Sequence, residues 1–129
     1  MSTTRPAIAL LALVSWLLVS CGSDGNAAGE SSSAARTIEI IATEYEFNGD
    51  PGVIGPGDTI EFDVENVGQI DHSLEVLSSS GTSLGRTTRI APGASASVTV
   101  TFDDAGVYRL ICDVDDHLSR GQTATISVS

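Results

Sequence analysis

The sequence predicts an all-β protein, specifically an antiparallel Greek-key β-sandwich or barrel formed by a single domain. From residue 37 onward, apolar and polar residues alternate over short runs, which is the pattern of strands with one face in a core. Turn sequences separate these runs at short intervals, namely GDPG, GPGD, SSSG, APGA and DDAG. No stretch after the first twenty residues has a sustained helical period, so the predicted core is made of strands alone.

The alternation also places the individual strands. It is clearest at residues 60–65, where Ile60, Phe62 and Val64 are separated by acidic residues, and at residues 98–102, where apolar residues are separated by threonines. Shorter runs of the same kind predict further strands at residues 37–41, 45–47, 72–77, 87–90, 107–112 and 123–128.

The first twenty residues differ from the rest of the chain. Arg5 precedes the mostly apolar run from Ala7 to Val19, which is too short to span a membrane and is typical of a secretory signal. The sequence LVSC that ends at Cys21 resembles the bacterial lipobox, in which the cysteine becomes the lipidated first residue of the mature protein. We therefore expect a lipoprotein signal peptide at residues 1–20 and a lipid on Cys21. The alternative is a plain signal peptide in which Cys21 is incidental.

Residues 21–36, CGSDGNAAGESSSAAR, are small and polar and predict a flexible tether, because such a run cannot form a core. Residues 37–129 then make one domain, which is too small to hold two cores. These features predict an extracytoplasmic protein that is lipid-anchored to the cell membrane, on its outer face or on the periplasmic side. Membrane contact would be through the lipid only.

The charge of the chain excludes one class of partner. There are 17 acidic residues against 6 arginines and no lysine, which gives a net charge of −11. A negative field of this kind repels nucleic acid and anionic lipid head groups. It favours a soluble monomer or an encounter with a basic partner.

Cys112 would have no disulfide partner if Cys21 carries a lipid, since these are the only two cysteines. A free thiol in an exported domain needs to be buried or bound. Strand parity places Cys112 on the core face of its strand, and it does the same for His72 and Gln122. The apolar residues that share these faces are Tyr108 and Leu110 for Cys112, Leu74 and Val76 for His72, and Ala124, Ile126 and Val128 for Gln122.

These polar residues are expected at the ends of strands rather than in the middle. Cys112 closes one strand, Gln122 opens the next, and His117 lies in the loop between them. His72 reaches the same pole if its own strand runs in the required direction. Two histidines and one cysteine with a weak axial ligand form the arrangement that holds copper for electron transfer.

Three segments resemble the cupredoxins, the small blue-copper proteins that include plastocyanin and azurin. GVYRLICDVDDHLSRGQ resembles their last strands and ligand loop, NVGQIDHSLEV the segment with the first histidine, and RIAPGASASVTVTFDDAGVY the turn and strand before the cysteine. The resemblance covers nearly all of residues 37–129 and implies copper, as Cu(I) and Cu(II), for the cofactor. It implies His72, Cys112 and His117 as the equatorial ligands.

Gln122 occupies the position where the family usually has an axial methionine, and the only methionine of this chain is Met1. A minority of cupredoxins have an axial glutamine. An amide oxygen is a harder donor than a thioether, so it should favour Cu(II) and lower the reduction potential. Asp115 and Asp116 replace the usual proline and glycine of the loop.

The same two aspartates bear on the partner. The family resemblance implies that electrons leave near His117. Asp115 and Asp116 directly precede His117 in the sequence. They predict an acidic docking face and a redox partner with a basic one, whose encounter weakens as salt rises. The alternative is that the two carboxylates only solvate a turn.

Other interpretations of the site remain open at this point. Structural zinc usually takes four strong ligands, and glutamine is a poor fourth. A cysteine nucleophile would need a substrate cleft and an oxyanion site, for which a small sandwich leaves little material. His72 could be an ordinary strand-edge residue and Cys112 an apolar filler.

The expected function is a membrane-tethered electron carrier that is not an enzyme. The alternatives are a non-redox protein that binds or delivers copper, and a metal-free cupredoxin-like interaction module.

Overall fold

A computed structural model describes residues 35–129. The expected signal peptide at 1–20, the expected lipid site at Cys21 and nearly all of the expected tether at 21–36 lie outside the described residues. No helix long and apolar enough to cross a membrane occurs between residues 35 and 129. The described strands are β1 (Arg36–Thr43), β2 (Glu46–Asn48), β3 (Asp58–Asn66), β4 (Glu75–Leu77), β5 (Ser83–Arg86), β6 (Ser95–Phe102), β7 (Gly106–Ile111) and β8 (Thr123–Val128).

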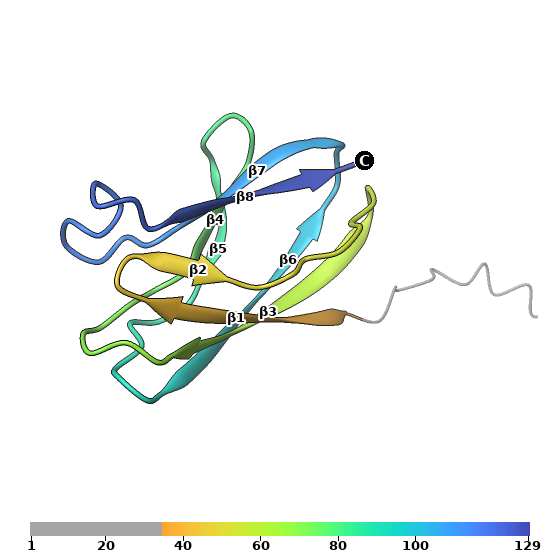
Figure 1. Ribbon diagram of the computed structural model, residues 1–129. Coiled ribbons are helices and arrows are strands. Elements are labelled where there is room, and N and C mark those ends of the chain that lie inside the picture. The colour runs from red at the N-terminus through yellow and green to blue at the C-terminus, as the bar shows by residue number, and fades with distance from the viewer. Residues whose placement is uncertain (1–34) are drawn as a thin grey trace, which may run out of the picture. The chain divides into compact units, whose positions relative to one another are not determined.

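The strands form two four-stranded sheets, in the orders β2-β1-β3-β6 and β5-β4-β7-β8 (Figure 1). The prediction of an all-β sandwich is confirmed. Every pair of neighbouring strands is antiparallel except β1 and β3, which run parallel over seven residue pairs. Alternation could not reveal this exception, because side chains alternate between the two faces in parallel and antiparallel strands alike.

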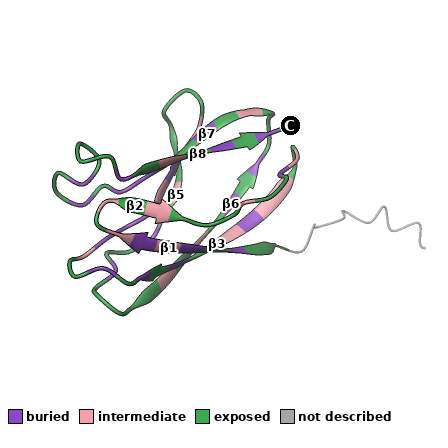
Figure 2. Cartoon of the chain, in the orientation of Figure 1, coloured by how far each residue is buried: buried purple, intermediate pink, exposed green. Residues whose placement is uncertain are grey.

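The core lies between the inward faces of the two sheets. Ile60, Phe62 and Val64 of β3 are buried, as their alternation with acidic residues predicts, and the strands of Figure 2 change between buried and exposed colours along their length. Phe102 of β6 links the two layers. Its ring packs edge to face against the Phe62 ring, with centroids 6.3 Å apart. It packs in the same way against the Tyr108 ring of β7, with centroids 4.8 Å apart. This rigid packing fixes the positions from which the connecting loops start.

The predicted strand at residues 87–90 is wrong, and β5 lies just before it at Ser83–Arg86. His72 and Ile90 exchange two backbone hydrogen bonds, of 3.0 and 2.7 Å. The Leu74 N–H, however, donates to the side-chain Oγ1 of Thr87 rather than to a backbone carbonyl. A side chain therefore replaces one backbone hydrogen bond between the segments at 72–77 and 87–90. His72 is left in an isolated bridge with Ile90, and the predicted strand at 72–77 is shortened to β4.

Three connections matter for the site. The β7–β8 loop and the β1–β2 turn lie at the same end of the sandwich, away from the C-terminus (Figure 1). The chain enters β4 through His72, which contacts residues of both connections. Segments far apart in the sequence thus meet at one pole.

Candidate metal centre

One group of side chains at this pole could hold a metal ion. His72, Cys112 and His117 each offer a ligand atom, and these atoms all lie within 4.8 Å of one another. All three residues are buried. The two imidazole rings have centroids 5.0 Å apart, and Cys112 Sγ lies 3.5 Å from His117 Nδ1. No other group of three potential ligands of this kind is found within residues 35–129.

Cys112 follows β7 directly and extends its ladder by one bond, because its N–H donates to the Gln122 carbonyl at 3.2 Å. The parity prediction for its strand is confirmed, since Tyr108, Leu110 and Cys112 are all buried. The sulfur lies 3.4 Å from the Ser73 N–H and 3.6 Å from the Ser73 hydroxyl. The Ser73 N–H donates to the sulfur, whereas the single proton of the Ser73 hydroxyl is donated to Asp113.

His117 is held by its own loop. Its N–H donates to the Val114 carbonyl at 3.0 Å, and its carbonyl accepts from the Gln122 N–H at 3.0 Å. Gly121 has a φ of 103°, a left-handed conformation that favours glycine and turns the chain back toward β8. These local bonds bring His117 and Gln122 to the same side of the loop as Cys112.

Gln122 is fully buried, and the backbone of the β1–β2 turn fixes the direction of its amide. Its Nε2 donates to the carbonyls of Thr43 and Glu46, at 3.1 and 3.4 Å. An amide nitrogen cannot accept a hydrogen bond, so these two acceptors turn the oxygen the other way. The Oε1 atom lies 2.8 Å from His72 Nδ1 and is therefore presented to the group of potential ligands.

Glu44, in the same turn, lies on the opposite side of the His72 ring. Its Oε1 is 3.7 Å from His72 Nε2. The pKa of the Glu44 carboxyl is below its ordinary value, chiefly because the Gln69 N–H donates to it. Burial opposes this effect, while the Ile70 N–H and the nearby His72 add to it. The group is therefore a carboxylate at neutral pH.

Tyr45 is half-buried and packs against His117. The two rings meet edge to face with centroids 5.1 Å apart, and only 3% of His117 is exposed. Arg120 lies over the Tyr45 ring at 5.0 Å and bonds to Asp116 at 2.7 Å, a contact that raises the pKa of the arginine. We call Tyr45, Arg120 and Asp116 the cover of the site.

Both aspartates beside His117 are near arginines. Asp116 pairs with Arg120, and an Asp115 oxygen lies 3.8 Å from Arg89. Asp113, which follows the cysteine, pairs with Arg86 at 3.2 Å and accepts a hydrogen bond from the Ser73 hydroxyl. The negative charge that the sequence places around this loop is thus partly neutralised.

The sequence identified the four residues that meet here but missed Ser73, Glu44 and Tyr45 as their neighbours. Strand parity cannot find such residues, because Glu44 and Tyr45 lie in a turn, where no periodicity applies. Ser73 faces away from the core in an ideal strand, yet only 3% of it is exposed. Only the fold shows that these residues contact the site.

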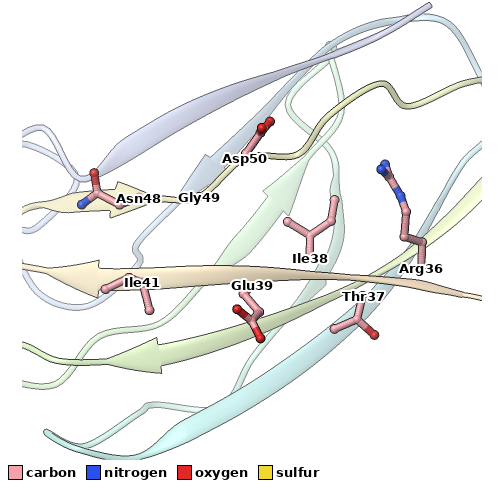
Figure 3. A pocket seen from close by; sticks show the side chains of 8 residues that line it. All are labelled: Arg36, Thr37, Ile38, Glu39, Ile41, Asn48, Gly49 and Asp50. Atoms are coloured by element: carbon pink, nitrogen blue, oxygen red, sulfur yellow. The ribbon is translucent and has the colours of Figure 1, made fainter.

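Two hollows of the described surface differ from the site in the residues that line them. One of about 630 Å³ adjoins β1 and the end of β2, and Figure 3 shows Arg36 of β1 and Asp50 of the segment after β2 among the residues that line it. Arg36 donates from this region to the carbonyls of Pro51 and Val53, at 3.0 Å each. A second hollow of about 410 Å³ lies beside Ser73 and Asp113. None of the four potential metal ligands lines either hollow, and all four are buried.

The profile of the cupredoxin-like domain matches residues 8–124, which is most of the chain. The chain belongs to this family. A search of curated proteins gave no significant match.

Among solved structures, this cupredoxin is similar to a dithionite-reduced auracyanin from Roseiflexus castenholzii, with 19% identity and a TM-score of 0.64 over 74% of this chain and 98% of the other. It is also similar to auracyanin A, a "blue" copper protein of Chloroflexus aurantiacus, with 19% identity and a TM-score of 0.62 over 74% and 99% of the two chains. A multicopper oxidase of Aquifex aeolicus matches with 15% identity and a TM-score of 0.58, over 75% of this chain and 30% of the oxidase. At these identities the likeness shows the fold.

The donor set of this cupredoxin fits copper better than it fits structural zinc. One thiol, two imidazoles and one neutral amide oxygen make a site with three strong donors and one weak donor. Structural zinc usually has four strong ligands in a tetrahedron. The direction of the Gln122 amide supports the same choice, because the atom presented to the site is a weak neutral oxygen donor.

Proposed function

We propose that this protein is an extracytoplasmic blue-copper protein, tethered to the membrane, that carries single electrons. The observation that carries the proposal is the buried group of His72, Cys112 and His117, whose ligand atoms lie within 4.8 Å of one another at one pole of a cupredoxin fold. Copper bound there would supply one-electron chemistry by alternating between Cu(II) and Cu(I).

Each residue of the site has a distinct role in the proposal. Cys112 binds as the thiolate and releases its proton when the ion enters. His72 and His117 bind through Nδ1, the ring nitrogens that face Gln122 and Cys112 respectively. Gln122 is the weak axial ligand, and its amide oxygen favours Cu(II), so the reduction potential should be lower than with methionine.

The packing around the site supports electron transfer over release of the ion. Cys112 and Gln122 have no exposed surface and His117 has almost none, so an acceptor protein could not reach the ligands directly. The β-sandwich holds ligands from separate segments in one geometry, which limits the rearrangement that accompanies a change of charge. A copper-delivery protein would instead need a ligand that its acceptor can approach.

The tether and the partner are parts of the same proposal. The lipobox-like LVSC at Cys21 and the polar run 21–36 support a lipid anchor and a flexible tether. The net charge of −11 supports a monomeric carrier whose redox partner presents a basic face. Because Asp115 and Asp116 are near arginines, the overall charge supports this preference more than the loop does. Electron-transfer rates with the partner should fall as ionic strength rises, and rates independent of salt would contradict a basic docking face.

The deciding experiment adds Cu(II) to the purified protein and records visible absorption and electron paramagnetic resonance. The wild type should show an intense thiolate-to-copper band that Cys112→Ser abolishes, together with reversible one-electron cycling. Gln122→Met should keep the band and raise the potential, because a thioether favours Cu(I). Identical spectra for the wild type and Cys112→Ser would exclude the proposed site, and an unchanged potential in Gln122→Met would exclude an axial glutamine.

A further inference from the structure

His72 Nε2 lacks a hydrogen-bond partner, and within residues 35–129 it is the one buried side-chain nitrogen or oxygen in this condition. The other ring nitrogen, Nδ1, faces the Gln122 oxygen at 2.8 Å. A neutral imidazole that binds a metal through one nitrogen carries its proton on the other. A metal ion on Nδ1 therefore makes Nε2 a buried N–H donor, and such donors are paired in folded proteins.

The Glu44 carboxylate lies where this donor points. Its Oε1 is 3.7 Å from Nε2, so a shift of about 0.7 Å would form a hydrogen bond. The same oxygen accepts the N–H groups of Gln69 and Ile70, at 2.5 and 3.0 Å. Two backbone donors from the segment just before His72 thus fix the carboxylate beside the ring.

Gly68 leaves the space that this carboxylate fills. A Cβ at residue 68 would lie 2.6 Å from Glu44 Oε1 and 2.8 Å from Oε2, well inside ordinary contact distance. The Gly68 N–H is itself held by Asn66 Oδ1 at 2.9 Å. A glycine, two backbone donors and a buried ring nitrogen therefore all converge on Glu44.

We infer that Glu44 is a positioning residue for the metal centre. It accepts the Nε2–H of His72, fixes the ring with Nδ1 toward the ion, and adds a negative charge behind the ligand that favours Cu(II) over Cu(I). This inference rests on the proposed function. The preference for Cu(II) follows from elementary electrostatics, since a nearby negative charge stabilises the ion of higher charge more strongly.

The first test measures Cu(II) affinity and reduction potential for the wild type, Glu44→Gln and Gly68→Ala. Glu44→Gln removes the charge but keeps an oxygen for the backbone donors, whereas Gly68→Ala keeps the charge and displaces the carboxylate. Both should weaken Cu(II) binding about tenfold, as loss of a partner behind a metal-binding histidine typically does. Each tenfold loss of preference for Cu(II) over Cu(I) raises the potential by about 59 mV.

Glu65→Gln is the matched control, because Glu65 is an exposed carboxylate near the end of β3 with no hydrogen bond to the site. An effect that does not depend on the position of the Glu44 carboxylate would shift the potential of Glu65→Gln as much as that of Glu44→Gln, or would leave Gly68→Ala like the wild type. Either of those results overturns the inference.

The second test uses Zn(II) alone, a diamagnetic ion, and proton–nitrogen NMR of the loaded protein. The His72 ring should show a slowly exchanging Nε2–H in the wild type, and this proton should exchange faster in Gly68→Ala. If Zn(II) gives this signal but Cu(II) gives no thiolate band, the proposed function fails, and the hydrogen bond by which Glu44 positions the His72 ring stands. A His72 ring without a protected Nε2–H, or a protein that takes up neither ion, overturns the inference.

Discussion

The two histidines of the site lie 5.0 Å apart, yet the chain holds them in different ways. His72 is fixed by partners far away in sequence, namely Ile90 through a backbone bridge, Gln122 at Nδ1 and Glu44 beside Nε2. His117 is fixed by backbone hydrogen bonds to Val114, Arg120 and Gln122, all within its own loop. The position of His72 therefore depends on the whole sandwich, whereas the position of His117 depends mainly on the local sequence of residues 112–122.

The largest expected effect is on the His72 side. Asn66 is fully buried, donates to the carbonyls of Ile70 and Ile90 at 2.8 Å each, and accepts the Gly68 N–H. Asn66→Ala leaves the Ile70 carbonyl and the Gly68 N–H without a partner, while the Ile90 carbonyl keeps its bond to the His72 N–H. It should lower the free energy of unfolding by about 3 kcal/mol. Urea unfolding of the metal-free protein measures this loss.

Asn48→Ala is the control for that substitution, because Asn48 is exposed in the short edge strand β2. Its effect should stay within about 0.5 kcal/mol. If Asn66→Ala costs no more than Asn48→Ala, the His72 segment does not depend on the network that the structure assigns to it.

A smaller effect is expected from the cover of the site. Tyr45→Ala removes the ring that meets His117 and should cost about 1 kcal/mol, the contribution of an aromatic pair. It should also expose His117 to diethyl pyrocarbonate in the metal-free protein, while His72 stays protected. Mass spectrometry of the modified protein separates the two histidines, and Tyr45→Phe keeps the ring as the control. Equal modification of His117 in wild type and Tyr45→Ala would show that Tyr45 does not cover it.

The smallest effect is expected at the outermost pair. Arg120 and Asp116 are both about half exposed, and exposed pairs four residues apart contribute about 0.5 kcal/mol or less. Arg120→Ala should therefore leave the thermal midpoint nearly unchanged and should reduce its dependence on salt. A loss as large as that of Asn66→Ala would mean that the loop is not held by its backbone bonds.

These differences explain what could be predicted from the sequence. Strand parity needs only alternating residues, so it placed His72, Cys112 and Gln122 on buried faces, and the structure confirms all three. The C-x4-H spacing in the loop is local and could be read directly. The lipid at Cys21 and the tether stay predictions.

The parts that could not be predicted depend on contacts between distant segments. The parallel pairing of β1 with β3 brings the β1–β2 turn to the pole, where Glu44 and Tyr45 meet the two histidines. Neither residue belongs to a pattern, and each is an ordinary turn residue until the sheet order is known. The misplaced strand at 87–90 has a related cause, because the Thr87 side chain takes the place of a backbone acceptor.

The burial of Cys112 has a consequence for how long the protein survives. The thiol has no exposed surface, so a dissolved oxidant or the thiol of another molecule can reach it only when the surrounding fold opens. Its chemical lifetime is therefore set by the local opening of β7 and the neighbouring segment at Ser73, rather than by the reactivity of sulfur. A variant that loosens this part of the sandwich would be inactivated by oxidation at temperatures where most of its molecules are still folded.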